Sequence, residues 1–122
     1  MPLIVKRVYE EATSDDGYRV LIDRLWPRGL SKEKASLDLW AKELAPGDEL
    51  RRWFNHRIER WPEFEKRYQA ELAQLEGERF KQVEQLARIA SEGTLTLLYA
   101  AKDMEHNNAI VFQNFLRNRF SI

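Results

Sequence analysis

The segment TLTLLYA, residues 94–100, is the part of the chain that most restricts its fold. It is a nearly continuous apolar run between two segments in which apolar residues recur with a helical period. Such a run is typical of a strand buried on both faces of a parallel sheet, because a strand with one face in water alternates polar and apolar residues. The sequence therefore predicts an α/β fold with a parallel sheet.

Two other segments predict strands near the amino terminus. Residues 3–8 (LIVKRV) form a β-branched run, and residues 18–23 (YRVLID) follow a polar stretch that ends in the turn signal Asp16-Gly17. Residues 36–46 (SLDLWAKELAP) alternate apolar and polar side chains. This alternation favours a third extended segment, although a short helix fits the same residues almost as well.

Four segments have the periodicity of amphipathic helices. The first begins near Pro46, which suits a first helical turn, and the last begins near Asp103, which is placed as an N-cap. Gly77 separates the second segment from the third, and Gly93 stands where a helix end takes a left-handed residue. The inward positions are Leu50, Trp53 and Phe54; Trp61, Phe64, Tyr68, Leu72 and Leu75; Phe80, Val83, Leu86, Ala87 and Ala90; and Ala109, Phe112, Phe115 and Leu116.

The order of these elements indicates the fold class. Strands come first, helices follow, and a strand and a helix end the chain, which predicts a layered α/β domain. A length of 122 residues suits one domain that buries about two-thirds of the surface of its unfolded chain. We therefore expect residues 1–122 to form a compact single-domain, three-layer sandwich with a small, mostly parallel, Rossmann-like sheet.

Composition excludes several function classes. Twenty basic residues balance twenty acidic ones, so no overall field attracts nucleic acid or a membrane, and any anion binding must be local. The absence of cysteine excludes disulfides, thiolate nucleophiles and cysteine-bound zinc. His56 and His106 form no metal-ligand motif, so we expect no metal and no cofactor. No run approaches the roughly 20 residues of a membrane span, and we expect a cytoplasmic protein.

Polar loops follow two of the predicted strands, at DRLWPRG and at AKDMEHNN. Ligands of open parallel sheets bind outside the carboxyl ends of the strands, where loops are free of packing and helix N-termini point their N–H groups. If the two strands are near neighbours, the loops face each other and form one site. The predicted site then contains Asp23, Arg24, Trp26, Arg28, Gly29, Lys102, Asp103, His106 and Asn107.

The residue types in these loops suit an anion. Arg24 and Arg28 offer planar, forked donors for phosphate or carboxylate, and Lys102 adds a point charge. Trp26 offers a stacking face for a base or ring, and Gly29 lets the backbone approach a ligand. A structural interpretation stands beside this one: Trp26 packs in the core, Arg24 pairs with an aspartate, and Gly29 serves a turn.

Catalysis has few candidates in this chain. If Asp103 caps the last helix, His106 lies at its third position, where the helix dipole lowers the pKa of an imidazole and favours its neutral form. A neutral histidine serves as a base, a donor or a ligand, and a solvated histidine is the alternative. The candidates are therefore His106, Asp103 and Asp23, whereas we expect His56 to be a loop residue between helices.

Four stretches together carry a family resemblance: DRLWPRGLSK, LDLWAKELAPGDELRRWF, RWPEFEKRYQAEL and TLTLLYAAKDMEHNNA. They resemble the YeaO-like branch of domain-of-unknown-function family 488, from about Leu3 to Leu116. The resemblance implies a compact three-layer α/β domain of small bacterial and archaeal proteins without an established reaction. Some members are labelled winged-helix regulators, but no helix-turn-helix with a basic recognition helix is visible here.

The resemblance also implies a lost site. The wider family often carries a Cys-His-Arg triplet just after the last strand, as a nucleophile-bearing site at a helix N-terminus. Asn107, Asn108 and Ala109 occupy these positions here, so thiol chemistry is lost. The arginine-rich loop and the corner formed by Lys102, Asp103 and His106 are retained.

Three functional hypotheses follow. The first is a non-catalytic or divergent binding domain for a small anionic ligand, such as a nucleotide, a sugar phosphate or a nucleic-acid end. The second is an enzyme in which Asp23 or Asp103 works with His106 as acid and base on a phosphorylated or glycosidic substrate. The third is a protein-interaction module, which an exposed Trp or Phe patch would indicate. The sequence does not determine the oligomeric state.

Overall fold

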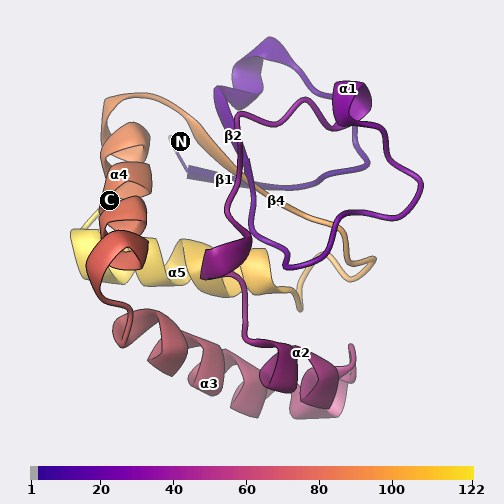
Figure 1. Ribbon diagram of the computed structural model, residues 1–122, viewed down its shortest axis with the longest axis vertical. Helices are drawn as coiled ribbons and strands as arrows, with labels where there is room; N and C mark the ends of the chain where they lie inside the picture. Colours follow the sequence, from indigo (N-terminus) through magenta and orange to yellow (C-terminus); the bar gives the residue numbers. More distant parts are fainter. Residues whose placement is uncertain (1–2) are drawn as a thin grey trace.

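The computed structural model, which describes residues 3–122, contains a sheet of four parallel strands (Figure 1). The strands are β1 (Leu3–Arg7), β2 (Tyr18–Leu21), β3 (Leu39–Trp40) and β4 (Leu95–Tyr99), in the order β1-β4-β2-β3. All five residues of β4 are buried. The predicted α/β fold and the interior position of the apolar run are therefore confirmed.

The larger core lies on one face of the sheet. Val20, Leu95 and Leu97 from that face pack with apolar residues of four helices. Tyr68 is fully buried among them, and its hydroxyl donates to the Leu44 carbonyl at 2.7 Å. The helices are α2 (Asp48–Phe54), α3 (Trp61–Ala73), α4 (Gly77–Glu92) and α5 (Asn108–Phe120).

The loop between β2 and β3 covers the other face of the sheet. It includes the one-turn helix α1 (Lys32–Ala35) and forms a smaller cluster with Leu21 and Leu98. The indole rings of Trp26 and Trp40 meet edge to face there, with centroids 5.4 Å apart. The sheet thus lies between a helical layer and a layer built mainly from a loop, which completes the sandwich.

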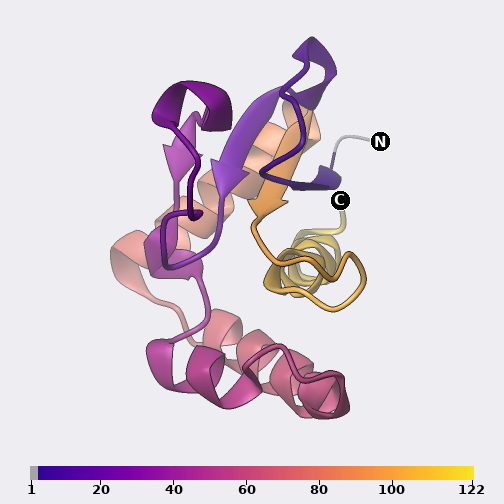
Figure 2. The same ribbon diagram turned by 90° about the vertical axis from the view of Figure 1, so that its right-hand side faces the viewer.

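Helices α2 and α3 lie beyond the carboxyl ends of the strands. Figure 2 shows the arrowheads of β2 and β4 pointing toward this helix pair. Phe54 of α2 stacks on Phe64 of α3, with ring centroids 4.2 Å apart, so the two helices pack through aromatic contacts. This arrangement places α2 opposite the loops that follow β2 and β4.

Several local expectations need correction. The segment 36–46 is extended only at Leu39–Trp40 and continues as a 3₁₀ turn at Lys42–Leu44, because it pairs with β2 over two residues alone. Pro46 lies outside α2, whose N-cap is Gly47. Gly93 has extended backbone, with φ −165°, and is not left-handed.

An ion-pair network closes the amino edge of the sheet. The buried Arg19 contacts the carboxylate of Asp16 and donates to the carbonyls of Ala35 (2.8 Å) and Ser36 (3.0 Å). Lys6 reaches the same carboxylate at 3.1 Å. Burial alone would raise the pKa of Asp16, but the Thr13 N–H and the two cations outweigh it and lower that pKa.

The predicted turn at Gly17 adjoins this network. Gly17 has φ +63°, and a Cβ there would lie 2.3 Å from the Thr94 carbonyl oxygen, so both the backbone conformation and the space require glycine.

Among residues 3–122, no helix combines the length and the apolar character needed to cross a membrane. The exposed large apolar side chains of the same range are Tyr9, Leu25, Ile58 and Met104, which include no Trp or Phe.

Candidate functional site

Asp23 joins the carboxyl ends of β2 and β4. Its Oδ2 accepts from the Ala100 N–H at 2.9 Å, and its Oδ1 accepts from the Asn108 side-chain amide at 3.0 Å. The same amide donates to the Ile22 carbonyl at 2.7 Å. Because these partners stand at the end of β4 and the start of α5, the predicted proximity of the two loops is confirmed.

Asp23 is partly buried. Burial raises the pKa of its carboxyl group, against the hydrogen bonds from Asn108 and Ala100 and the charge of His56. Among residues 3–122, Asp23 has no ion-pair partner. The carboxyl edge therefore differs from the amino edge, because no cation is bound directly to its part-buried carboxylate.

A cavity of about 700 Å³ opens beside Asp23. Its walls come from the loop after β2, from α2 with the turn that follows it, and from the start of α5. Four of the lining side chains are arginines. The polar and aromatic residues of the lining are Tyr9, Asp23, Arg24, Trp26, Arg28, Arg51, Arg52, Phe54, Asn55, His56, Phe64, Asn107 and Asn108.

Asp48 links two of these arginines. Its Oδ1 lies 3.7 Å from Nε of Arg24 and 3.2 Å from Nη2 of Arg51. Nε of Arg24 also donates to the Pro46 carbonyl at 3.3 Å, whereas Nε of Arg51 is buried and has no hydrogen-bond partner among residues 3–122. Since a guanidinium carries five N–H donors, both groups keep donors for a ligand.

The other two arginines of the cavity are exposed. Neither Arg28 nor Arg52 forms an ion pair within the described part of the chain. The backbone carbonyl of Arg28 accepts from the Tyr9 hydroxyl at 2.8 Å, which ties the loop after β2 to the end of β1. The cavity therefore has cations on both sides: Arg24 and Arg28 on the loop, Arg51 and Arg52 on α2.

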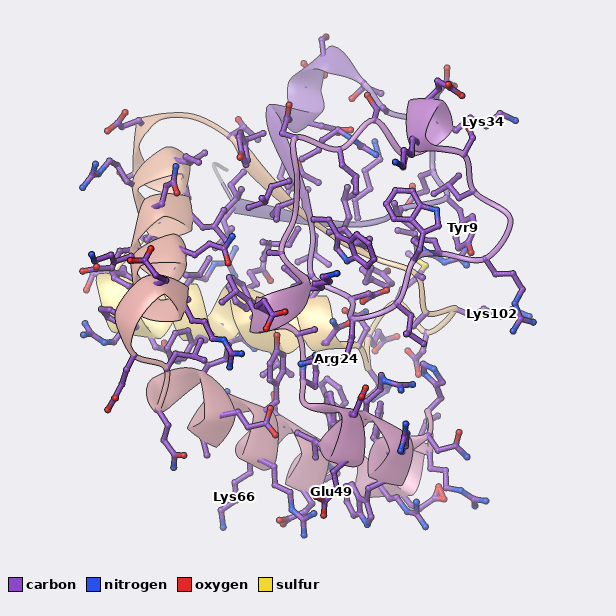
Figure 3. The ribbon with its side chains drawn as sticks, viewed as in Figure 1. Tyr9, Arg24, Lys34, Glu49, Lys66 and Lys102 are labelled. Atoms are coloured by element: carbon purple, nitrogen blue, oxygen red, sulfur yellow. The ribbon has the colours of Figure 1, made fainter. Side chains whose placement is uncertain are left out.

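Some predicted ligand residues lie elsewhere. Lys102 is exposed and points away from the body of the protein, as Figure 3 shows, and it does not line the cavity. Gly29 has φ +74° and also lies outside the lining, so it serves a turn. Trp26 lines the cavity, but its indole N–H donates to the Leu30 carbonyl at 2.7 Å and its ring packs in the smaller cluster.

The prediction that Asp103 caps the last helix is wrong. The N-cap is Asn107, whose Oδ1 accepts from the Ile110 N–H at 3.1 Å. Asp103 instead holds a turn within the preceding loop, accepting from the N–H groups of Glu105 (2.9 Å) and His106 (3.0 Å). His106 thus precedes the helix, and the expected dipole effect on its first turn does not apply.

Asp103 and His106 nevertheless form a pair. Nδ1 of His106 lies 2.9 Å from Oδ2 of Asp103, and its ring meets the Trp61 ring edge to face at 5.3 Å. The hydrogen bond from the Glu105 N–H, together with His106, lowers the pKa of Asp103 against the opposing effect of burial. The pair does not line the cavity, so the structure separates it from Asp23 and the arginines.

The contribution of α2 was not expected from the sequence. No role was predicted for Arg51 or Arg52, and His56 was expected to be a loop residue between helices. The run RRWFNHR, residues 51–57, holds four cationic or titratable side chains in seven positions, which is the signal that was available. His56 has a left-handed backbone, with φ 55°, in the turn that brings it to the cavity.

The arrangement provides donors and positive charge rather than metal ligands. Within residues 3–122, no group of three or more His, Cys, Asp or Glu side chains is placed to hold a metal ion. The cavity offers four guanidinium groups, one imidazole and one part-buried carboxylate. Such a set favours an anion with additional hydrogen-bonding groups.

Comparison with known proteins agrees with the motifs. Residues 2–121 match the family described as the inactive DUF488-N3 subclade. The chain is 46% identical to the uncharacterised protein YeaO of Escherichia coli, over 97% of this chain and 99% of that protein. It is 36% identical to the uncharacterised protein Rv3073c of Mycobacterium tuberculosis, over 94% of this chain and 93% of that protein. No solved structure matches. The chain therefore belongs to the inactive DUF488-N3 subclade, within the family that its motifs indicated.

Proposed function

We propose that this protein is a binding domain for a small phosphorylated ligand, held in the cavity at the carboxyl edge of the sheet. The observation that carries the proposal is that four arginines from two separate elements line one cavity. Like charges at close range repel, so such a group is most stable when an anion occupies the space between its members. Guanidinium groups match phosphate oxygens through paired hydrogen bonds.

The acidic residues nearby leave this charge largely uncompensated. Asp48 contacts Arg24 and Arg51, but it is about half exposed, and its charge is screened by water. Asp23 is engaged with a backbone N–H and with Asn108 rather than with an arginine. Positive charge therefore exceeds negative charge in the cavity, although the whole chain is neutral.

The start of α5 adds to this preference. The helix has 13 residues, and its capping residue Asn107 and first residue Asn108 both line the cavity. The N-terminal end of a helix carries partial positive charge from its unpaired N–H groups and favours a nearby anion. A volume of about 700 Å³ also lies within the usual range of small-molecule sites, roughly 300–1,000 Å³.

A titration with pyrophosphate tests the proposal. We expect pyrophosphate to bind the wild-type protein in isothermal titration calorimetry at low ionic strength. The double variant Arg24→Ala with Arg28→Ala should lose at least about 100-fold in affinity, because each charged hydrogen bond contributes about 1.5–3 kcal/mol. Arg88→Ala, a change of an exposed arginine on α4, is the matched control and should bind like wild type. Failure of the wild-type protein to bind phosphate, pyrophosphate or sulfate contradicts the proposal.

A second candidate function is enzymatic, and the contact between His106 and Asp103 favours it. A carboxylate on Nδ1 leaves Nε2 as an acceptor, which is the arrangement of a general base. The family description as inactive counts against this candidate. A screen of phosphorylated and glycosidic substrates decides the question: turnover that disappears in His106→Gln supports an enzyme, and silence with intact pyrophosphate binding excludes it.

A further inference from the structure

We infer that the ligand is a phosphorylated polyol, meaning a sugar phosphate or the ribose phosphate part of a nucleotide, whose hydroxyl groups donate to Asp23 while its phosphate contacts Arg24 and Arg51. This inference rests on the proposed function and narrows its ligand class. It comes from the fact that the cavity is not uniformly cationic. Its lining combines the arginines with a carboxylate that keeps free acceptor positions.

Asp23 has spare capacity for hydrogen bonds. Each of its carboxylate oxygens accepts one hydrogen bond, from Ala100 to Oδ2 and from Asn108 to Oδ1. An ionised carboxylate accommodates about four donors. Because Asp23 lines the cavity, a ligand hydroxyl has access to the positions that remain.

A ligand made of phosphate alone binds the arginines but uses only part of this cavity. It offers no donor to Asp23, whose part-buried carboxylate lines the same cavity and repels its charge. A hydroxyl group is neutral and donates a short, strong hydrogen bond to a carboxylate. The complementary molecule therefore carries its negative charge at one end and its hydroxyl donors at the other.

The groups proposed to bind the two ends of this molecule point to different parts of the site. Asp23 and Arg24 are neighbours in sequence, but their side chains diverge. Asp23 contacts the end of β4 and the start of α5, whereas Arg24 contacts the Pro46 carbonyl and Asp48, the first residue of α2. Phe54 and Phe64 also line the cavity and contribute apolar surface. That surface suits the carbon skeleton that joins a phosphate to its hydroxyls.

A matched pair of ligands tests the inference without changing the protein. Glycerol 3-phosphate and propyl phosphate share a three-carbon skeleton and a phosphate, and only the former has hydroxyl groups. We expect the wild-type protein to bind glycerol 3-phosphate at least about tenfold more tightly in isothermal titration calorimetry, since a hydrogen bond to a charged group is worth about one to two orders of magnitude in affinity. Ribose 5-phosphate should bind at least as well as glycerol 3-phosphate.

The variant Asp23→Asn provides a second test with the same two phosphate esters. The amide keeps one acceptor for the Ala100 N–H and loses the other, so the ratio between the two esters should fall to about threefold or less, while the affinity for propyl phosphate is unchanged or rises. Asp15→Asn, the same change at an exposed position on the opposite edge, is the control and should keep the wild-type ratio. If thermal melting shows that Asp23→Asn does not fold, the wild-type ratio decides alone.

The outcomes separate this inference from the proposed function. Equal affinity for the two esters overturns the polyol inference and leaves an anion site. Tighter binding of phosphoethanolamine than of glycerol 3-phosphate also overturns it, in favour of a ligand with an ammonium group. Absence of binding by every phosphate ester and by pyrophosphate overturns both proposals.

Discussion

The two edges of the sheet use the same residue types in opposite ways. At the amino edge, Arg19 donates hydrogen bonds to Asp16 and to two backbone carbonyls, and Lys6 completes the network. At the carboxyl edge, Arg24 and Arg51 share one carboxylate oxygen of Asp48 and keep most of their donors. The first edge is closed by its own side chains, whereas the second provides groups that a further molecule can satisfy.

The buried carboxylate of Asp16 and the part-buried carboxylate of Asp23 show the same difference between the two edges. Burial raises the pKa of both, but at Asp16 the hydrogen bonds from Thr13, Lys6 and Arg19 reverse the effect. At Asp23 burial prevails over its uncharged donors, and the pKa is raised. A charged group that is satisfied within the fold contributes stability, and one that is left unsatisfied indicates a site where binding supplies the missing partner.

The largest effect is expected from breaking the closed edge. Arg19→Met should reduce the free energy of unfolding by about 3–5 kcal/mol, because it leaves the buried carboxylate of Asp16 and two carbonyls without their main donor. Urea denaturation measures this change. Arg88→Met, on the exposed side of α4, is the control and should stay within about 0.5 kcal/mol of wild type. A loss below about 1 kcal/mol for Arg19→Met would show that the amino edge is not a closed network.

The next largest effect concerns the open edge and appears in binding rather than in folding. Arg24→Ala with Arg51→Ala should lower pyrophosphate affinity at least about 100-fold, while the free energy of unfolding changes by no more than about 1 kcal/mol, because the ion pairs removed are partly exposed. Calorimetry and urea denaturation of the same preparation measure both. A large loss of stability with unchanged binding indicates that these arginines serve the fold.

An intermediate effect concerns pH. The pKa of Asp23 is raised in the folded state, so the folded protein binds more protons than the unfolded chain, and stability should rise as the pH falls from neutral toward the ordinary value of 3.8. The pKa of Asp16 is lowered, so its contribution is present above 3.8 and is lost as the pH falls through the folded-state value. Urea denaturation at about pH 7, 5 and 3 measures both slopes.

Single variants show which aspartate causes each change of the unfolding free energy with pH. Asp23→Asn should remove the gain between neutral and mildly acidic pH, and Asp16→Asn should remove the loss at the acidic end. Stability that falls steadily from pH 7 to pH 5 in the wild-type protein contradicts the part assigned to Asp23. Persistence of the acidic loss in Asp16→Asn contradicts the other part.

The fold was predictable where a strand is buried on both of its faces, because such a strand is a nearly continuous apolar run in the sequence. The run TLTLLYA predicts β4 for this reason, and all five residues of that strand are buried. The two residues of β3 were harder to define, because their conformation depends on pairing with Val20 and Leu21 and not on a local pattern. The start of α5 was misplaced because Asp103 and Asn107 are both good N-caps, and only the packing of the helix decides between them.

The site was predictable only where it depends on the sheet. Parallel neighbouring strands bring their carboxyl ends together, so the proximity of Asp23 to the segment after β4 followed from topology. The position of Arg51 follows from the packing of α2 on α3, through the stacked rings of Phe54 and Phe64. The cationic run at residues 51–57 marks this helix as unusual, but it does not indicate that the helix lines a cavity formed by other segments.

The smallest effect is expected from the aspartate that links the arginines, and it gives the most direct comparison of the two edges. Asp48→Asn should change the free energy of unfolding by less than about 1 kcal/mol, because Asp48 is about half exposed and its ion pairs are screened. The identical change at Asp16, which is buried, should cost about 3–5 kcal/mol. The two variants differ from wild type by the same atoms, so urea denaturation of both isolates the effect of the surroundings. Similar losses in the two variants would mean that Asp48 closes the carboxyl edge as firmly as Asp16 closes the amino edge, and that the arginines of the cavity are already satisfied.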